Sequence, residues 1–295
     1  MQEAVRHHYV PRFYLEQWAG PDGKLCITRR IGERLLESRL APKSTAFQER
    51  LYSFKDEPLS TNPRPDIIET KVLASVDDHG ARAHRRLLEV GPAGLTTAER
   101  RAWATFLNAM FERDLRHIRQ NEATAKQIAE QVIKEMEDSA PDEASRERVS
   151  MATCLIDTSA AASNLVLRTM VKDMQAQDVL EYFENMWWIV FDMPPELALH
   201  TSDRPLVVNV GQQRTPINIA WMSLSPAKLF AMFPKSWIPQ DASRLSGDIE
   251  ETFRMMAGFH NLLLLQERPE RLYSQQPISE SERRAARALL TTAGE

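Results

Sequence analysis

The chain has 295 residues, of which 43% are hydrophobic and 26% are charged, and its formal net charge is -4 at pH 7. These values exclude a disordered chain, which has fewer apolar residues and a larger net charge. The acidic balance also disfavours a dedicated nucleic-acid binder, which usually carries a strong positive excess. The chain has two lone cysteines, which leads us to expect a cytoplasmic protein. We expect no membrane span, because no apolar run approaches the roughly 20 residues that cross a bilayer.

Residues 1–60 predict a small β-structure at the start of the chain. Tyr9–Trp18 is rich in aromatic residues and begins extended, because Pro11 disfavours the helical region for the residue before it. After a Pro-Asp-Gly turn, Leu25–Thr28 and Arg34–Leu40 have the composition of two paired strands.

Residues 61–185 predict a block of helices. Apolar residues at helical spacing indicate a helix over 66–89, and Thr96–Glu99 is a capping box that opens the next helix. We expect that helix to continue without a break through Asp114 and His117 into a charged stretch at 121–139. One long helix from about 143 to 174 and a short one ending near 185 follow.

Residues 186–295 predict mostly strands. The expected strands are 187–191, 197–200, 206–210, 217–222, 229–233 and an edge strand at 261–266. Helices are expected at 247–259 and after the capping box that begins at Ser279. Segregated helices and strands predict a helix-rich α+β fold with a small N-terminal hairpin, a central helical block and a C-terminal, mostly antiparallel sheet. We expect one domain, 1–295, with parts 1–60, 61–185 and 186–295.

The motifs of common nucleotide-binding enzymes, zinc proteases and serine hydrolases are missing from the sequence. Three other groups of polar residues could carry chemistry. The first is His7–Tyr14, where adjacent histidines in an extended segment point to opposite faces, so that one faces inward. An inward imidazole is a candidate base or metal ligand, whereas the bland alternative is that the histidines cap an apolar plug that includes Tyr14.

The second group follows an apolar helix face that ends at Met110 and leads to Arg113, Asp114 and His117. A buried arginine must be paired, and it could clamp an anionic substrate or form a structural pair with Asp114. The third group, His200–Pro205, follows an expected strand; Asp203 could be a metal ligand, a general base or the cap of a local turn. Glu69, beside an apolar stripe, is a weaker candidate, since a first-turn carboxylate also suits the helix dipole.

The run His8-Tyr9-Val10-Pro11-Arg12-Phe13-Tyr14-Leu15 resembles the opening motif of a bacterial domain-of-unknown-function family. Thr201-Ser202-Asp203-Arg204-Pro205 is similar to a Thr-Ser-Asp-Asn-Pro motif of the same family, with Arg204 where an asparagine is usual. The resemblance covers nearly the whole chain and also includes Glu69 and Arg113. It implies no known reaction, but it favours a functional role for these residues together.

The first hypothesis is a hydrolase, nuclease-like and with or without a divalent metal, that acts on a phosphate-bearing small molecule or nucleic acid. His8, Glu69 and Asp203 would be catalytic groups or metal ligands. Substrate would be bound by Arg12, Tyr14, Arg113, Thr201 and Ser202. The second hypothesis is a non-catalytic binding or regulatory module of a bacterial conflict or defence system. A third, nucleic-acid binding without chemistry, requires one basic surface formed by Arg29, Arg30, Arg34, Arg39 and Lys43.

Overall fold

A computed structural model describes residues 5–55, 64–154, 156–194, 198–210, 217–237 and 260–290. The chain divides into two compact units. Unit 1 comprises Met1–His7, Gln48–Val76 and Phe111–Ala176, and unit 2 comprises His8–Phe47, Asp77–Met110 and Gln177–Glu295. These boundaries do not follow those of the three sequence parts, so the single domain stays a prediction. Among the described helices, none is both long and apolar enough to cross a bilayer.

Unit 1 is mainly helical. Its elements are a π-helical segment Ile68–Leu73, α4 (Leu115–Asp138), α5 (Glu143–Thr153) and α6 (Thr158–Met174). Each of the three α-helices begins at an aspartate whose side chain accepts backbone N–H groups of the first turn: Asp114, Asp142 and Asp157. Two expectations were therefore wrong, because α3 (Thr97–Glu112) ends before Arg113 and the segment 143–174 is two helices.

The chain segment near Lys55 is fixed to α6 within unit 1. The side-chain amide of Asn164 accepts from the backbone N–H of Lys55 at 2.8 Å and donates to its carbonyl at 2.9 Å. Ser163 donates to Glu122 of α4 at 2.6 Å, so α6 is tied to α4 as well. Paired polar groups of this kind compensate for the burial of Asn164 and Ser163.

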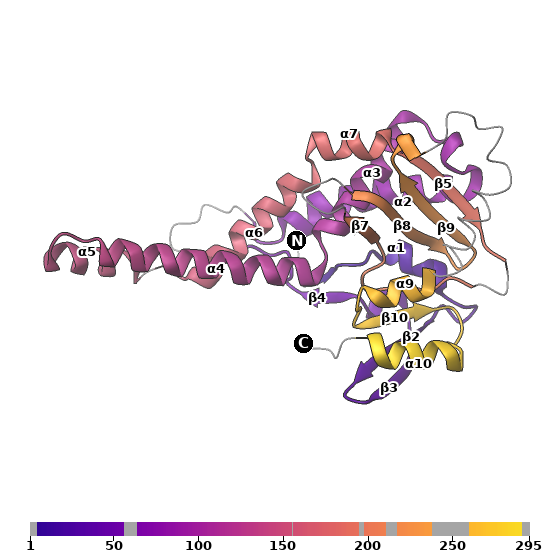
Figure 1. The fold of residues 1–295 in the computed structure, drawn as a ribbon, viewed down its shortest axis with the longest axis horizontal. Coiled ribbons are helices and arrows are strands. Elements are labelled where there is room, and N and C mark those ends of the chain that lie inside the picture. Colours follow the sequence, from indigo (N-terminus) through magenta and orange to yellow (C-terminus); the bar gives the residue numbers. More distant parts are fainter. Residues whose placement is uncertain are drawn as a thin grey trace. The chain divides into compact units, whose positions relative to one another are not determined.

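Unit 2 contains the sheets and the helices that pack on them (Figure 1). Its helices are α1 (Arg12–Leu15), most of α2 (Ala74–Val90) and α3, α7 (Gln177–Asn185), α9 (His260–Gln266) and α10 (Glu280–Leu289). Its strands are β2 (Leu25–Ile31), β3 (Arg34–Leu40), β5 (Trp187–Asp192), β6 (Thr201–Ser202), β7 (Val207–Val210), β8 (Ile217–Ser225), β9 (Lys228–Phe233) and β10 (Arg271–Ser274). A further pair, β1 (Arg6–His8) and β4 (Phe47–Glu49), lies at the boundary between the units in sequence.

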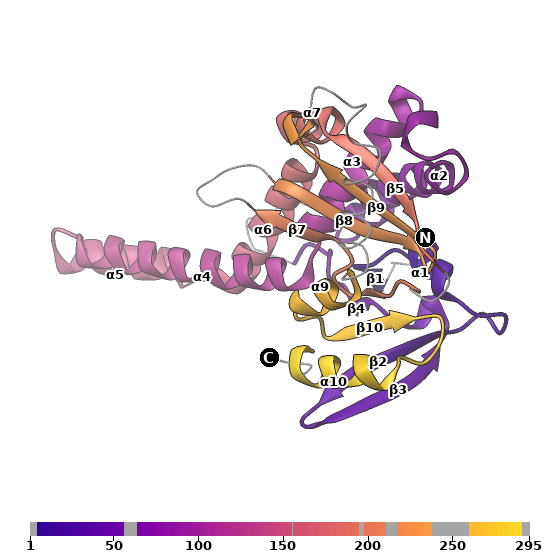
Figure 2. The ribbon, with the colours of Figure 1, turned by 45° about the vertical axis from the view of Figure 1, so that its right-hand side comes forward.

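The described strands of unit 2 form two four-stranded antiparallel sheets with orders β5-β9-β8-β7 and β3-β2-β10-β6 (Figure 2). The expected α+β class, the β2–β3 hairpin and the C-terminal sheet are confirmed. The expected edge strand at 261–266 was wrong, because this segment is helix α9. The strand expected at 197–200 was wrong for its described residues, 198–200, which precede the short strand β6. The helix expected at 247–259 lies outside the described residues.

The β5-β9-β8-β7 sheet is covered by α2 and α3 through aromatic side chains. Trp103 of α3 meets Phe230 of β9 edge-on at 5.8 Å, and His84 of α2 bonds to the carbonyl of Leu224 at 2.8 Å. Gly80 lets α2 and α3 approach closely, because a Cβ at this position would lie 2.5 Å from the ring of Phe106. This packing supports the strand loops that carry the candidate site.

Side chains alternate between the two faces of the β3-β2-β10-β6 sheet. One face, called the tyrosine face below, carries Ile27, Arg29, Thr201, Asp203, Arg271 and Tyr273. The other, called the helix face, carries Cys26, Thr28, Ser202, Leu272 and Ser274. The helix face packs against α9 and α10 through Leu272, Leu264, Leu265 and Ala286, and the N-terminal segment packs on the tyrosine face through Tyr9, Tyr14 and Thr45.

Candidate functional site on the tyrosine face

The predicted site residues are divided between the two units. Unit 2 contains His8, Arg12, Tyr14, Thr201, Ser202 and Asp203, whereas unit 1 contains Glu69 and Arg113. The meeting of all eight residues at one site stays a prediction.

A row of charged side chains crosses the tyrosine face. Arg271 of β10 lies directly opposite Arg29 of β2 in the antiparallel register. On the other side of β10, the backbone N–H of Asp203 donates to the carbonyl of Arg271 at 3.2 Å, which places Asp203 next in the row. Like charges directly opposite each other destabilise a sheet. Two arginines and one aspartate therefore lie side by side on this part of the face, and Glu270 also acts electrostatically on Arg271.

The N-terminal motif contacts this row through its first tyrosine. Arg271 donates a hydrogen bond to the hydroxyl of Tyr9, and the backbone N–H of Tyr9 donates to Ala46 at 3.0 Å. Beside it, Tyr273 and Thr45 share a hydrogen bond of 3.2 Å. His8 precedes Tyr9, is half-buried and packs against the ring of Phe47 at 5.6 Å.

Burial and charge act in opposite directions on the ionisable groups of this row. Burial by itself lowers the pKa of Arg271, but Tyr9, Tyr273, Asp203 and Glu270 outweigh burial, and the pKa is raised. Burial raises the pKa of Tyr273 well above its usual value, with Tyr9 and Asp203 adding to the increase. Arg271 thus stays a cation and Tyr273 stays a neutral phenol near pH 7.

Tyr14, Thr201 and Ser202 are fully buried beneath the face. The hydroxyl of Tyr14 lies 2.7 Å from that of Thr201 and donates to the carbonyl of Ser223 at 2.8 Å, and burial raises its pKa. Ser202 accepts from the backbone N–H of Arg204 at 3.0 Å, so the serine closes this turn. These bonds connect the N-terminal helix to two sheets, and the substrate-binding role of the three residues stays a prediction.

The exposed candidate in this group is Arg12. It begins the short helix α1 and lies 4.0 Å from Glu16, with more than half of each side chain in solvent. A surface ion pair of this kind is weak. The binding of an anion by Arg12 stays a prediction.

In unit 1, Glu69 lies in the first turn of the π-helical segment and Arg113 is fully buried after α3. The expectation that Arg113, Asp114 and His117 continue one helical stripe was wrong, because α3 ends at Glu112 and Asp114 caps α4. His7 is the fully buried histidine of the adjacent pair, and its Nδ1 accepts from the backbone N–H of Tyr52 at 2.9 Å.

A metal site formed by His8, Glu69 and Asp203 stays a prediction, because it combines residues of both units. Within the described ranges, no group of three His, Cys, Asp or Glu side chains is arranged to hold an ion. The described polar side chains around Arg271 are Arg29, two tyrosines, Asp203 and Glu270. The two guanidinium groups of this set are donors that can bind an anion.

The requirement for a nucleic-acid surface on the β2–β3 hairpin is not met. The register places Arg29 and Arg34 on one face and Arg30 and Arg39 on the other. Arg30 is paired with Glu33 at 3.4 Å, and Arg39 is paired with Asp22 at 2.8 Å. The basic residues therefore do not gather on one surface.

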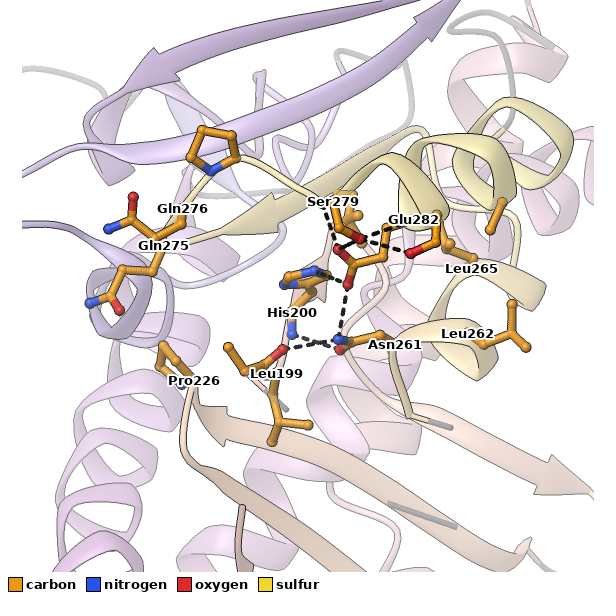
Figure 3. Close-up of a pocket in the computed structure, with 15 residues that line it drawn as sticks. Leu199, His200, Pro226, Asn261, Leu262, Leu265, Gln275, Gln276, Ser279 and Glu282 are labelled. Carbon is orange, nitrogen blue, oxygen red and sulfur yellow. Dashed lines mark hydrogen bonds and ion pairs between the residues drawn. The ribbon is translucent and has the colours of Figure 1, made fainter. Parts of the chain in front are cut away.

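The helix face of the same sheet borders a pocket of about 490 Å³. Nε2 of His200 lies 2.7 Å from Oε1 of Glu282, which is the capping-box glutamate of α10 (Figure 3). The backbone N–H of His200 donates to Asn261 of α9 at 2.8 Å. Hydrogen bonding to His200 is the main cause that lowers the pKa of Glu282 to about 2.

Sequence reasoning missed the partners of Asp203 on the tyrosine face. Arg271 and Tyr273 lie on β10, a four-residue strand without a turn signal strong enough to mark it. From the sequence, Arg29 was assigned to a basic surface, and its pairing with Arg271 was not predicted. The signal that could have found them is the alternation Arg271-Leu272-Tyr273, which places two polar groups on the face opposite an apolar one.

Comparison with known families decides the identity at the level of the family. Residues 6–257 match the family described as "Protein of unknown function (DUF4238)". The chain belongs to this family. The expectation of a domain-of-unknown-function family is confirmed, and for this member of DUF4238 no curated protein and no solved structure matches. Arg271, Tyr273, Asn261 and Glu282 all follow the last matched residue, so both faces of the sheet are completed by a segment beyond the DUF4238 match.

Proposed function

We propose that this protein is a hydrolase that binds the phosphate of its substrate over the tyrosine face of the β3-β2-β10-β6 sheet. The observation that carries the proposal is the pairing of Arg29 with Arg271 beside Asp203. A phosphate placed between the two guanidinium groups would accept charge-assisted hydrogen bonds from both. The substrate class is a phosphate-bearing small molecule or nucleic acid.

The row offers acid–base groups as well as cations. Asp203 would accept a proton from the attacking water while the water oxygen forms a bond to phosphorus and the leaving alcohol departs. The hydroxyl of Tyr9 accepts from Arg271, and we propose that it donates its own proton to the leaving oxygen. A version in which His8, Glu69 and Asp203 hold a divalent metal is part of the proposal and is tested separately. We place the activity in the cytoplasm, since both cysteines are free thiols.

The test combines phosphate binding with turnover. Phosphate affinity is measured by ³¹P NMR for the wild type, Arg29→Gln and the matched control Arg30→Gln, which lies one residue away on the opposite face. Hydrolysis of bis(p-nitrophenyl) phosphate and p-nitrophenyl phosphate is measured with EDTA or with added Mg²⁺ or Mn²⁺. We expect Arg29→Gln alone to weaken phosphate binding, and Asp203→Asn to lower kcat by about 100-fold or more. Equal affinity in both arginine variants contradicts the site.

A second candidate function is a binding module without catalysis. The observation in its favour is the network of Tyr14, Thr201 and Ser223, which is sealed and hydrogen-bonded and so resembles a structural core more than an active site. This candidate predicts that phosphate binds with the same dependence on Arg29 while no phosphate ester is hydrolysed under any metal condition.

A further inference from the structure

We propose that the pocket on the helix face, between the loop before β6, α9 and α10, binds a small amphiphilic amine. Its ammonium head would lie beside Glu282 and its apolar body against the leucines of the pocket wall. This ligand is distinct from the phosphate of the proposed function, and neither proposal depends on the other.

The size and walls of the pocket suit a small molecule. A volume of about 490 Å³ lies within the range typical of ligand sites. Apolar side chains from the loop, α9 and β10 line part of the pocket: Leu199, Leu262, Leu265 and Leu272. The polar lining includes His200, Asn261 and Glu282, which Figure 3 shows turned toward one another, and Gln275 and Gln276, which lie apart from them. An apolar wall with a few convergent polar groups is the usual form of a ligand pocket.

Charge selects a cationic head for this ligand. Of the described residues that line the pocket, only Glu282 and His200 are ionisable, and neither lysine nor arginine is among them. The pKa of Glu282 is lowered to about 2, chiefly by the hydrogen bond from His200, so this carboxyl is ionised at pH 7. Burial lowers the pKa of the neighbouring His260 to about 4, so this second imidazole adds no positive charge at pH 7. An anion is disfavoured here and a cation is favoured.

The carboxylate of Glu282 is held in place and still has room for a donor. Its Oε2 accepts from the backbone N–H of Ser279 at 2.8 Å and from the hydroxyl of Ser279 at 2.7 Å, so this oxygen is saturated. Its Oε1 accepts from His200 at 2.7 Å and has a long contact of 3.5 Å with the amide of Asn261. A ligand N–H can replace that long contact, because Asn261 keeps its bond of 2.9 Å to the carbonyl of Ala198.

The capping box makes this site pre-organised. A glutamate fixed at the first turn of α10 does not lose side-chain freedom when a ligand binds, so less binding energy is lost to ordering. Glutamine is also found at this capping position. Glu282→Gln therefore removes the charge while α10 keeps a cap.

The test uses three probes of equal length, n-hexylammonium, hexan-1-ol and hexanoate, titrated into the full chain with methyl ¹³C NMR of Leu262 and Leu265 as the readout. We expect n-hexylammonium to bind saturably and at least about 10-fold more tightly than hexanoate. The attraction between two unit charges about 4 Å apart in a partly shielded site is large enough for this ratio. In Glu282→Gln the preference for the amine should fall at least about threefold. Glu280→Gln is the matched control, since Glu280 lies in the same first turn, is exposed and does not line the pocket.

Three results would overturn the proposal. The first is hexanoate binding as tightly as n-hexylammonium to the wild type, which needs no variant to fold. The second is the absence of saturable n-hexylammonium binding up to about 10 mM, an affinity too weak for a specific site. The third is an unchanged preference in a folded Glu282→Gln protein.

Discussion

The two faces of the β3-β2-β10-β6 sheet are built from alternate residues of the same strands, and yet they offer opposite chemistry. The tyrosine face places Arg29 and Arg271 side by side, whereas the polar end of the pocket on the helix face has Glu282 as its charged group. Neighbouring residues of β10 belong to different environments. Arg271 is a cation in the row on the tyrosine face, whereas Leu272 belongs to the apolar core on the helix face. The difference teaches that a strand of four residues can contribute to two proposed sites. Successive side chains of a strand point to opposite faces, so the two sets of residues do not mix.

The largest effect should be on acid stability, to which a buried imidazole of α2 and one of α9 contribute. Burial lowers the pKa of His84, which packs against Tyr14, and of His260, in α9, to about 4 each. An unfolded chain binds protons at these histidines already near pH 6.5, so stability is complete above this pH and is lost as pH falls toward 4. The slope should approach about 1.4 kcal/mol per pH unit for each imidazole.

Chemical denaturation at a series of pH values measures this loss. His84→Gln and His260→Gln should each reduce the slope between pH 6.5 and 4, and the exposed His79→Gln serves as the control. A slope that neither buried-site variant changes would mean that the acid sensitivity arises elsewhere in the chain.

The next largest effect separates the charge of Arg271 from its shape. Arg271→Met should weaken phosphate binding by about 10- to 100-fold, since charge-assisted hydrogen bonds contribute about 1.5–3 kcal/mol. Arg271→Lys keeps the charge but loses the planar fork, and we expect an intermediate affinity. The measurement is ³¹P NMR titration at constant ionic strength. Equal phosphate affinities in the lysine and methionine variants would show that the charge at position 271 does not contribute to phosphate binding.

A smaller effect is expected where the N-terminal helix is fixed to the tyrosine face. Tyr14→Phe removes the hydrogen bonds to Thr201 and to the carbonyl of Ser223 and leaves buried partners unsatisfied. The free energy of unfolding should decrease by about 1–3 kcal/mol. Tyr182→Phe, at a partly exposed position of α7, should have little effect. Urea denaturation compares the two, and similar losses would contradict the role given to Tyr14.

The smallest effect concerns Glu282 on the helix face. Hydrogen bonding to His200 lowers its pKa to about 2, so the stability that it contributes is present above pH 4.5 and is lost as pH falls from 4.5 toward 2. Glu282→Gln should flatten the stability curve between pH 4.5 and 2. An identical curve in the variant would contradict the lowered pKa of this carboxyl.

Much of the fold could be predicted because local signals mark it. The capping boxes at Thr96 and Ser279 locate the starts of α3 and α10, and the alternating strands β2, β3, β5 and β9 have clear composition. Leu262–Leu265 was read as a strand, because a short apolar run does not reveal its period. The break between α3 and α4 was missed since Asp114 is an N-cap inside what reads as one helical pattern.

The candidate site could be predicted only in part, for a physical reason. Asp203 and the N-terminal motif are recognisable by their neighbours in sequence, but their partners are fixed by strand register between distant segments. Arg29 and Arg271 are 242 positions apart in the sequence, and they lie opposite each other because of the register between β2 and β10. A local pattern contains no information about such a pairing, and the same holds for His200 and Glu282.

The most direct test of the two-face account is a crossed binding experiment with Arg29→Gln and Glu282→Gln, each titrated with phosphate and with n-hexylammonium. The account predicts that Arg29→Gln weakens only phosphate binding and that Glu282→Gln weakens only amine binding. If either variant changed both affinities equally, or if phosphate bound more tightly when Glu282 lost its charge while Arg29→Gln had no effect, the assignment of one ligand to each face would be contradicted.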